Sequence, residues 1–253
     1  MSARQQRTRR RKPPGRVVRP FWFIIVVLAV LVVIGIYGLS TWPALYPHTI
    51  NVFGNRVVSE SEIVSRAQIN LTRNMWMQNT GAMVGRIEAI PYIESARIHR
   101  QPPDTMLIYV TERAPYAVVD DRGQRVTIDK TMRVLQQGAP LDSPFTLPVL
   151  EVTAPTLDAP GSTFANANVA TLVGCAGDFA AAHLDAATLS FDRYGDVVVT
   201  LRSGIRVLLG DPTTVAPKVM LVGPILAKVE HGRRRVAALD LRAITTPVVV
   251  YAK

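Results

Sequence analysis

The sequence predicts an α+β protein in which a single transmembrane helix precedes a β-α-α-β-β unit and a mixed, mainly antiparallel β domain with helices. Three observations predict this order. Residues 21–39 form an uncharged, apolar run of nineteen residues. Alternating apolar segments, which are typical of strands, then enclose two helical patterns. Further alternating segments separated by glycine-containing turns fill most of the remaining chain.

The N-terminal tail, residues 1–20, carries eight of the ten net positive charges and no acid. The rest of the chain has 21 basic residues against 19 acidic ones, so its charge does not indicate a nucleic-acid-binding surface. Because the cations precede the apolar run, the tail is predicted to be cytoplasmic and the C-terminal part extracytoplasmic. The basic tail is interpreted as a signal that sets the membrane topology and as a segment that contacts lipid. No nucleic-acid partner is expected, and DNA binding by the tail is the alternative.

The apolar run at residues 21–39 is predicted to span the membrane once. As a helix it rises about 28 Å, which matches a hydrocarbon core of roughly 30 Å. A cleaved signal peptide is the alternative, but Trp42-Pro43 stands where a small-residue cleavage site is expected. Residues 40–47 contain Pro43 and Pro47 and are predicted to form a short, stiff linker.

The first folded unit is predicted to be a three-stranded sheet with two helices across one face. Ser59 and Glu62 have the spacing of a capping box that begins the first helix. Thr80 begins the second helix, which Pro91 ends. The predicted strands are residues 48–53, 93–100 and 105–112, and the last two are joined by a proline turn.

The segment between these two helices, residues 70–78, contains Met75, Trp76 and Met77. These side chains are expected to pack in the core, since Met and Trp commonly fill irregular gaps. An exposed contact patch is the alternative.

The second unit, residues 115–253, is predicted to be rich in strands. Residues 143–161 contain several prolines and are predicted to be a long surface connection. Helices are predicted at residues 166–184 and from Thr213 to Gly232. The predicted strands are residues 116–119, 124–128, 134–135, 188–191, 196–201, 205–209, 235–241 and 247–252.

No catalytic, cofactor-binding or metal-binding residues are predicted, and the protein is expected to be non-enzymatic. The single cysteine, Cys175, lies among small residues and is expected to be a packing residue. A Cys175–His183 pair would lie about 12 Å apart along a helix, too far for direct contact. The four histidines are scattered, and the sequence has no zinc, P-loop or hydrolase motif.

Four sequence motifs occur in a recognisable order. They are Ile50-x-Val52-x-Gly54-Asn55 with Val58-Ser59-x-x-Glu62-Ile63, Ile90-Pro91-Tyr92-Ile93-Glu94-Ser95-Ala96-Arg97-Ile98-His99-Arg100 with Pro103, Ile108-x-Val110-x-Glu112-Arg113-x-Pro115, and Leu239-Asp240-Leu241-Arg242. Because these motifs occur in this order, the chain resembles the FtsQ/DivIB family of bacterial cell-division proteins. Residues 70–78 depart from the glycine- and leucine-rich link usual in that family.

The resemblance implies a POTRA domain at residues 48–114 and an FtsQ-type β domain at residues 115–253. It implies a scaffold of the divisome in the inner membrane at the division septum, where it recruits septal peptidoglycan synthesis machinery. The β domain would bind the small division proteins FtsB and FtsL, and the POTRA domain would bind other division proteins. The alternatives are a POTRA-containing secretion or outer-membrane assembly factor and an enzyme acting on the cell wall.

The predicted partner-binding residues are Val248, Val249, Val250, Tyr251 and Ala252. If this strand forms a sheet edge, its free amides and carbonyls can accept a strand from a partner. Tyr251 is the preferred anchor, because a partly buried aromatic side chain often dominates an interface. An internal, already paired strand is the alternative. The edge of the POTRA sheet is a second candidate surface.

Overall fold

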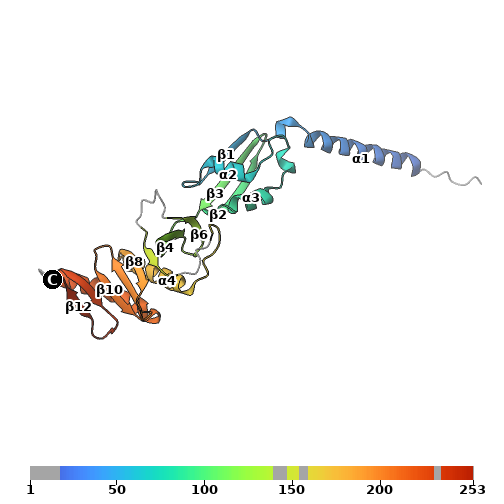
Figure 1. Cartoon of the computed structure of the whole chain (residues 1–253). Coiled ribbons are helices and arrows are strands. Elements are labelled where there is room, and N and C mark those ends of the chain that lie inside the picture. The colour runs from blue at the N-terminus through green and yellow to red at the C-terminus, as the bar shows by residue number, and fades with distance from the viewer. Residues whose placement is uncertain (1–17, 139–146, 154–158, 231–234, 253) are drawn as a thin grey trace, which may run out of the picture.

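The chain folds into three parts in a row (Figure 1). The computed structural model describes residues 18–138, 147–153, 159–230 and 235–252. A long helix lies at one end, a small α/β unit follows, and a larger sheet carries the C-terminal strand at the other end. The predicted α+β fold class is confirmed.

Helix α1 (Val18–Ser40) contains the predicted membrane segment. Within it, Phe21–Ser40 is long and apolar enough to cross a membrane, and none of this stretch is buried by the rest of the protein. A short 3-10 helix, η1 (Pro43–Leu45), follows in the predicted linker. An apolar helix left uncovered by the protein requires another apolar surrounding, which a bilayer supplies.

The first unit has the predicted β-α-α-β-β order. Its strands form a sheet of order β1-β3-β2, in which β1 and β3 are parallel and β2 and β3 antiparallel. Ile63 and Ile87, one from each helix, are fully buried together with Ile108 of the central strand. The elements are β1 (Thr49–Phe53), α2 (Glu60–Ala67), η2 (Met75–Met77), α3 (Thr80–Glu88), β2 (Ile93–Gln101) and β3 (Thr105–Glu112).

Two local features explain why this sequence forms these turns. The Ser59 side chain accepts a hydrogen bond from the Glu62 amide, which is one half of the predicted capping box. Gly54 has a positive φ of +91°, and a Cβ there would lie 2.1 Å from the carbonyl oxygen of Val110. Only glycine fits this close approach of two backbones.

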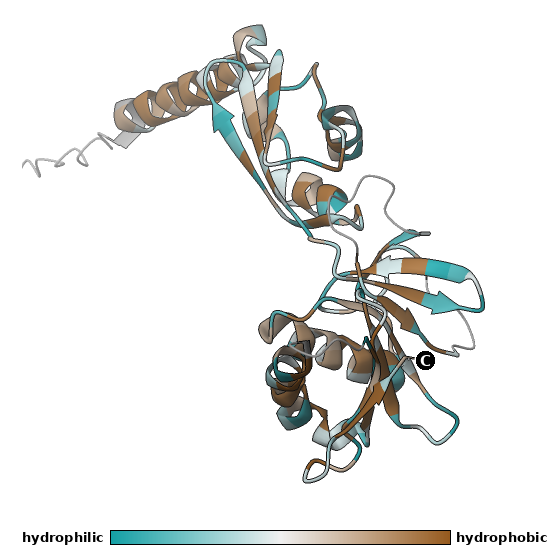
Figure 2. Ribbon diagram, turned by 90° about the vertical axis from the view of Figure 1, so that its left-hand side faces the viewer, coloured by the Kyte–Doolittle hydropathy of each residue, from teal (hydrophilic) through white to brown (hydrophobic). Residues whose placement is uncertain are grey.

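The second unit is a nine-stranded sheet of order β12-β11-β10-β9-β8-β7-β4-β5-β6. Most neighbouring strands are antiparallel, while β4-β7, β7-β8 and β10-β11 are parallel. Both helices pack on one face of it (Figure 2). The elements are β4 (Ala117–Asp121), β5 (Gln124–Ile128), β6 (Val134–Gln137), β7 (Val149–Glu151), α4 (Ala167–Ala181), β8 (Ala186–Phe191), β9 (Val197–Leu201), β10 (Arg206–Gly210), η3 (Pro212–Thr214), α5 (Val215–Glu230), β11 (Val236–Asp240) and β12 (Val248–Tyr251).

The prediction of a plain surface connection at residues 143–161 is wrong, because β7 lies within it. This three-residue strand pairs in parallel with both β4 and β8, and its Leu150 is fully buried. The predicted helix start at Thr213 also shifts, since η3 precedes α5. Gly232, its predicted end, lies outside the described residues.

The motif Leu239-Asp240-Leu241-Arg242 serves the fold. Leu239 and Leu241 are fully buried in the main core. Asp240 lies between them and accepts hydrogen bonds from Nη2 of Arg242 at 2.6 Å, and from its Nε and its backbone amide, both at 3.0 Å. The hydrogen bond from this guanidinium lowers the pKa of Asp240. The motif therefore fixes the turn that leads from β11 toward β12.

Candidate partner-binding edge

Strand β12 lies at one edge of the nine-stranded sheet and pairs only with β11 among the described strands. The amide of Ala252 donates to the carbonyl oxygen of Arg235, at 2.9 Å, so the backbone of Ala252 faces β11. Backbone groups alternate along an antiparallel strand. The amides and carbonyls of Val249 and Tyr251 therefore face away from β11, toward the free edge.

The side chains of β12 are apolar and largely exposed. Val248, Val250 and Tyr251 are 54%, 47% and 41% exposed, while Val249 packs partly against the main core. Charged side chains are a usual protection of an edge strand, and residues 248–252 carry no charge. The pairing of β12 with β11 has one register shift, between Val236 and Ala238 of β11. This edge has the backbone groups and the apolar surface that strand addition needs.

The opposite edge of the same sheet, strand β6, is closed by its own chain. The Val134 amide donates to the Ser162 carbonyl, and the Gly161 amide donates to the Val134 carbonyl, both at 2.8 Å. The side chain of Leu135 packs into the core of the first unit. Tyr92 of the first unit donates to the side chain of Gln136 at 2.6 Å.

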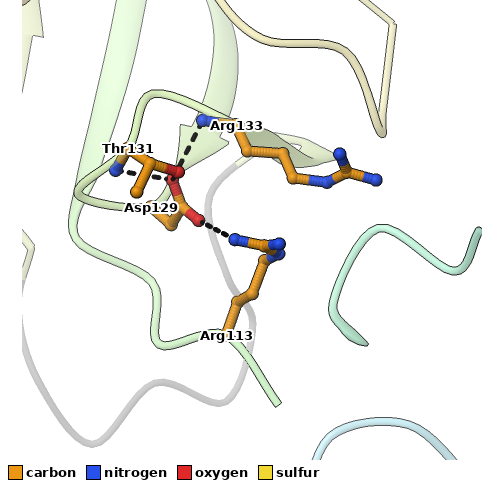
Figure 3. A network of polar contacts seen from close by, with 4 residues as sticks. All are labelled: Arg113, Asp129, Thr131 and Arg133. Atoms are coloured by element: carbon orange, nitrogen blue, oxygen red, sulfur yellow. Dashed lines mark hydrogen bonds and ion pairs between the residues drawn. The ribbon is translucent and has the colours of Figure 1, made fainter. Parts of the chain in front are cut away.

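The contacts of Leu135 and Gln136 with the first unit form a junction between the two units, and an ion pair adds to it (Figure 3). The Arg113 guanidinium lies 2.9 Å from the carboxylate of Asp129, and both side chains are largely buried. Asp129 also accepts bonds from the backbone amides of Thr131 and Arg133. Burial opposes the charged carboxylate, but these hydrogen bonds outweigh it and lower the pKa of Asp129.

Sequence reasoning did not identify this junction. A signal was present, because Arg113 follows the last strand of the first unit directly at the predicted boundary. The neighbouring Glu112 accepts bonds from the amides of Val57 and Val58, both at 2.9 Å. The motif around these residues thus joins separate parts of the fold.

The sheet of the first unit has two edges, β1 and β2, each paired only with β3 in the described chain. Exposed charged residues, Glu94 and Arg97, lie on β2. Phe53 of β1 stacks on Tyr109 of β3 with ring centroids 5.2 Å apart, and both rings are nearly half exposed. The charges on β2 oppose pairing with another chain.

The expectation that Met75, Trp76 and Met77 all pack in the core is only partly correct. Met75 is fully buried with Met83 and Met106. Trp76 and Met77 are 51% and 49% exposed. The three residues form a 3-10 turn, so their side chains cannot all face the core.

Cys175 is buried on α4, and burial, with the nearby Asp178 carboxylate, raises the pKa of its thiol to about 12. A thiol in this state is a poor nucleophile. Within the described ranges, no group of three or more His, Cys, Asp or Glu side chains can hold a metal ion.

Three features of the described residues define the class of this protein. They are an N-terminal helix of membrane-spanning length, a small β-α-α-β-β unit and a larger sheet with an open edge. This combination is that of a POTRA protein with a membrane-spanning helix. The family described as "POTRA domain, FtsQ-type" matches residues 47–113. This match assigns residues 47–113 to the FtsQ-type POTRA domains, and the chain is similar to FtsQ/DivIB cell-division proteins.

Curated relatives support this assignment. The cell division protein FtsQ of Koribacter versatilis is 32% identical over 122 residues, which cover 45% of this chain and 35% of the relative. Mycobacterium tuberculosis FtsQ is 30% identical over 43% of this chain and 36% of its own length. Mycobacteroides abscessus FtsQ is 24% identical over 81% of this chain and 64% of its own length. The first two matches thus span about a third of each relative.

Among solved structures, the major extracytoplasmic domain of DivIB from Geobacillus stearothermophilus is similar, with 22% identity and a TM-score of 0.33. The similarity covers 48% of this chain and 98% of that one.

Proposed function

We propose that this protein is a non-enzymatic scaffold of the bacterial division complex. The observation that carries the proposal is the unpaired, uncharged edge of β12 in a relative of FtsQ cell division proteins. A sheet edge binds by exchanging backbone hydrogen bonds and needs no catalytic group. The relatives favour this function over that of a secretion or outer-membrane assembly factor.

The proposed layout follows the predicted parts. Residues 1–20 form the cytoplasmic tail, residues 21–39 the inner-membrane helix and residues 40–47 the linker. Residues 48–114 form the POTRA domain and residues 115–253 the β domain, both outside the cytoplasm at the division septum. This topology places β12 on the same side of the membrane as the septal peptidoglycan synthesis machinery.

The partner supplies an extended segment that pairs with β12. The outward backbone groups of Val249 and Tyr251 form its hydrogen bonds, and Tyr251 provides an aromatic anchor. FtsB and FtsL are the proposed partners of this edge, and other division proteins bind the POTRA domain. Together these contacts link early and late division proteins.

A proline at position 249 tests strand addition. The amide of Val249 faces the free edge, so Val249→Pro removes a donor to the partner but no bond to β11, a position where edge strands tolerate proline. The full chain is reconstituted with FtsB and FtsL, and binding is measured beside the thermal midpoint. We expect binding to fall at least about tenfold, the equivalent of about 1.4 kcal/mol, while the midpoint changes little.

The matched control is Val250→Pro, whose amide faces β11, so that it disrupts the fold of the edge itself. A Val249→Pro protein that is folded and binds normally would place the partner elsewhere. Failure of the unmodified chain to bind FtsB and FtsL would contradict the proposed partners.

A further inference from the structure

The loop between α2 and α3 exposes apolar side chains although it is rigidly held. Leu71, Trp76 and Met77 are 55%, 51% and 49% exposed. Between them, Met75 is fully buried in a methionine cluster. Exposed apolar side chains on a loop that is held by hydrogen bonds indicate an interaction surface rather than a poorly packed segment.

Two side chains hold this loop in place. The Arg100 guanidinium donates to the carbonyl oxygens of Met75 and Gln78, at 2.9 and 2.7 Å, and lies 5.4 Å from the centre of the Trp76 ring. The buried Gln78 side chain bonds both the amide and the carbonyl of Asn70. Trp76 therefore has a fixed position on the surface.

The same loop contacts the outer end of the membrane helix. The Asn74 side chain donates to the carbonyl oxygen of Leu39 at 3.0 Å, and Asn74 is buried. Arg73 and Met77 line a cavity together with four residues of α1, namely Val33, Ile36, Tyr37 and Ser40. Figure 1 shows this end of the first unit beside the end of α1.

This contact sets the depth of the loop. Val33 precedes Ser40 by seven residues, which is about 10 Å along a helix axis. Since Phe21–Ser40 matches the hydrocarbon thickness, Ser40 lies at the boundary between acyl chains and headgroups, and the two turns before it lie in the outer part of the hydrocarbon. The loop lies beside these turns and so reaches the same depth.

We infer that the α2–α3 loop, residues 68–79, is a lipid-docking surface that inserts Leu71, Trp76 and Met77 into the outer face of the bilayer. Tryptophan is favoured at this boundary, where its ring is partly in the apolar phase. The exposed Arg73 is placed to meet lipid phosphates. A lipid surface fits this mixture of apolar side chains and one cation.

The docking would give the POTRA domain a second attachment to the membrane and so fix its tilt. It rests on α1 being a membrane anchor and goes beyond the proposed binding of partners at β12, which lies at the far end of the molecule.

Trp76 itself reports on the proposed contact. The full chain carrying Trp22→Phe and Trp42→Phe, which leaves Trp76 as the sole tryptophan, is reconstituted in nanodiscs of phosphatidylcholine brominated near the top of one acyl chain. We expect blue-shifted emission that the bromines quench by roughly half, as for an indole at the interface. The control carries all three Trp→Phe changes with Tyr194→Trp in a 72% exposed turn, and should not be quenched.

A second variant, which keeps only Trp22, tests the anchor separately. Quenching of Trp22 without quenching of Trp76 would overturn the lipid contact and leave the anchor intact. Lack of quenching at both sites would overturn the anchor and the inference together. If Trp76 emission shifts only when other division proteins are added, the patch binds a protein and the lipid assignment is wrong.

Discussion

The two edges of the nine-stranded sheet differ in almost every respect. At β6, the chain covers its own edge with residues 161–164, packs Leu135 into the POTRA core and adds the Arg113–Asp129 pair. At β12, the outward backbone groups have no partner strand in the described chain, and the side chains are exposed and uncharged.

This difference separates an internal junction from an available surface. An edge strand presents the same backbone groups wherever it lies, so its role depends on what the neighbouring chain does with them. The closed edge holds the two units together. The open edge is the proposed binding surface for another protein, and the two edges can be disturbed independently.

The largest effect is expected from opening the closed edge. Asp129→Ala leaves the Arg113 guanidinium buried without its carboxylate and removes the acceptor for Thr131 and Arg133. Loss of one member of a buried pair costs about 3–5 kcal/mol. Chemical unfolding of the extracytoplasmic part should show this decrease in unfolding free energy.

Asp120→Ala is the matched control for that change. Its partner Arg125 is half exposed, so the pair is screened by water and the loss should stay near 1 kcal/mol. Equal losses for the two variants would show that the junction contributes no more than an ordinary surface pair.

A smaller effect, on binding alone, is expected from protecting the open edge. Val248→Lys with Val250→Lys places two cations on exposed positions of β12, in the manner of natural edge strands. Affinity for the proposed partners FtsB and FtsL, measured by calorimetry, should fall about tenfold or more, or about 1.4 kcal/mol. The control Tyr194→Lys adds charge at an exposed turn and should bind normally. Unchanged affinity in the double variant would show that the edge is not used.

The smallest effect is expected from acid, which should weaken the closed edge. The pKa of Asp129 is lower in the folded chain than in the unfolded chain, where it is about 4. Its contribution to stability is therefore present above about pH 4 and is lost as pH falls below that value through the folded pKa. Unfolding free energies between about pH 6 and pH 3 should fall less in Asp129→Asn than in the unmodified protein. Parallel pH curves would contradict this assignment.

Local signals were sufficient to predict most of the fold. The alternation in β2 and β3, the Ser59 cap and the proline turn between the strands depend on neighbouring residues, so a single sequence reveals them. The strand β7 could not be predicted in this way. Its three residues lie among prolines, and it becomes a strand only because β4 and β8, distant in sequence, pair with it on both sides.

The candidate site likewise has features that depend on neighbouring residues and features that depend on residues distant in sequence. The apolar, β-prone character of residues 248–252 is local and was predicted, but that β12 lies at an edge depends on the order of all nine strands. The orientation of Trp76 and Met77 was predicted wrongly, because composition does not reveal which side of a short turn faces the core. Asp129 was missed since its partner Arg113 belongs to another unit.

The elongated arrangement has one consequence for assembly. Helix α1 and strand β12 lie at opposite ends of the molecule (Figure 1). In the proposed orientation, with α1 in the bilayer, the joined units would hold the open edge at a set height above the membrane. A partner anchored in the same membrane must carry a stalk of matching length to reach that edge. The protein would thus act as a molecular ruler that selects partners by their reach as well as by their sequence.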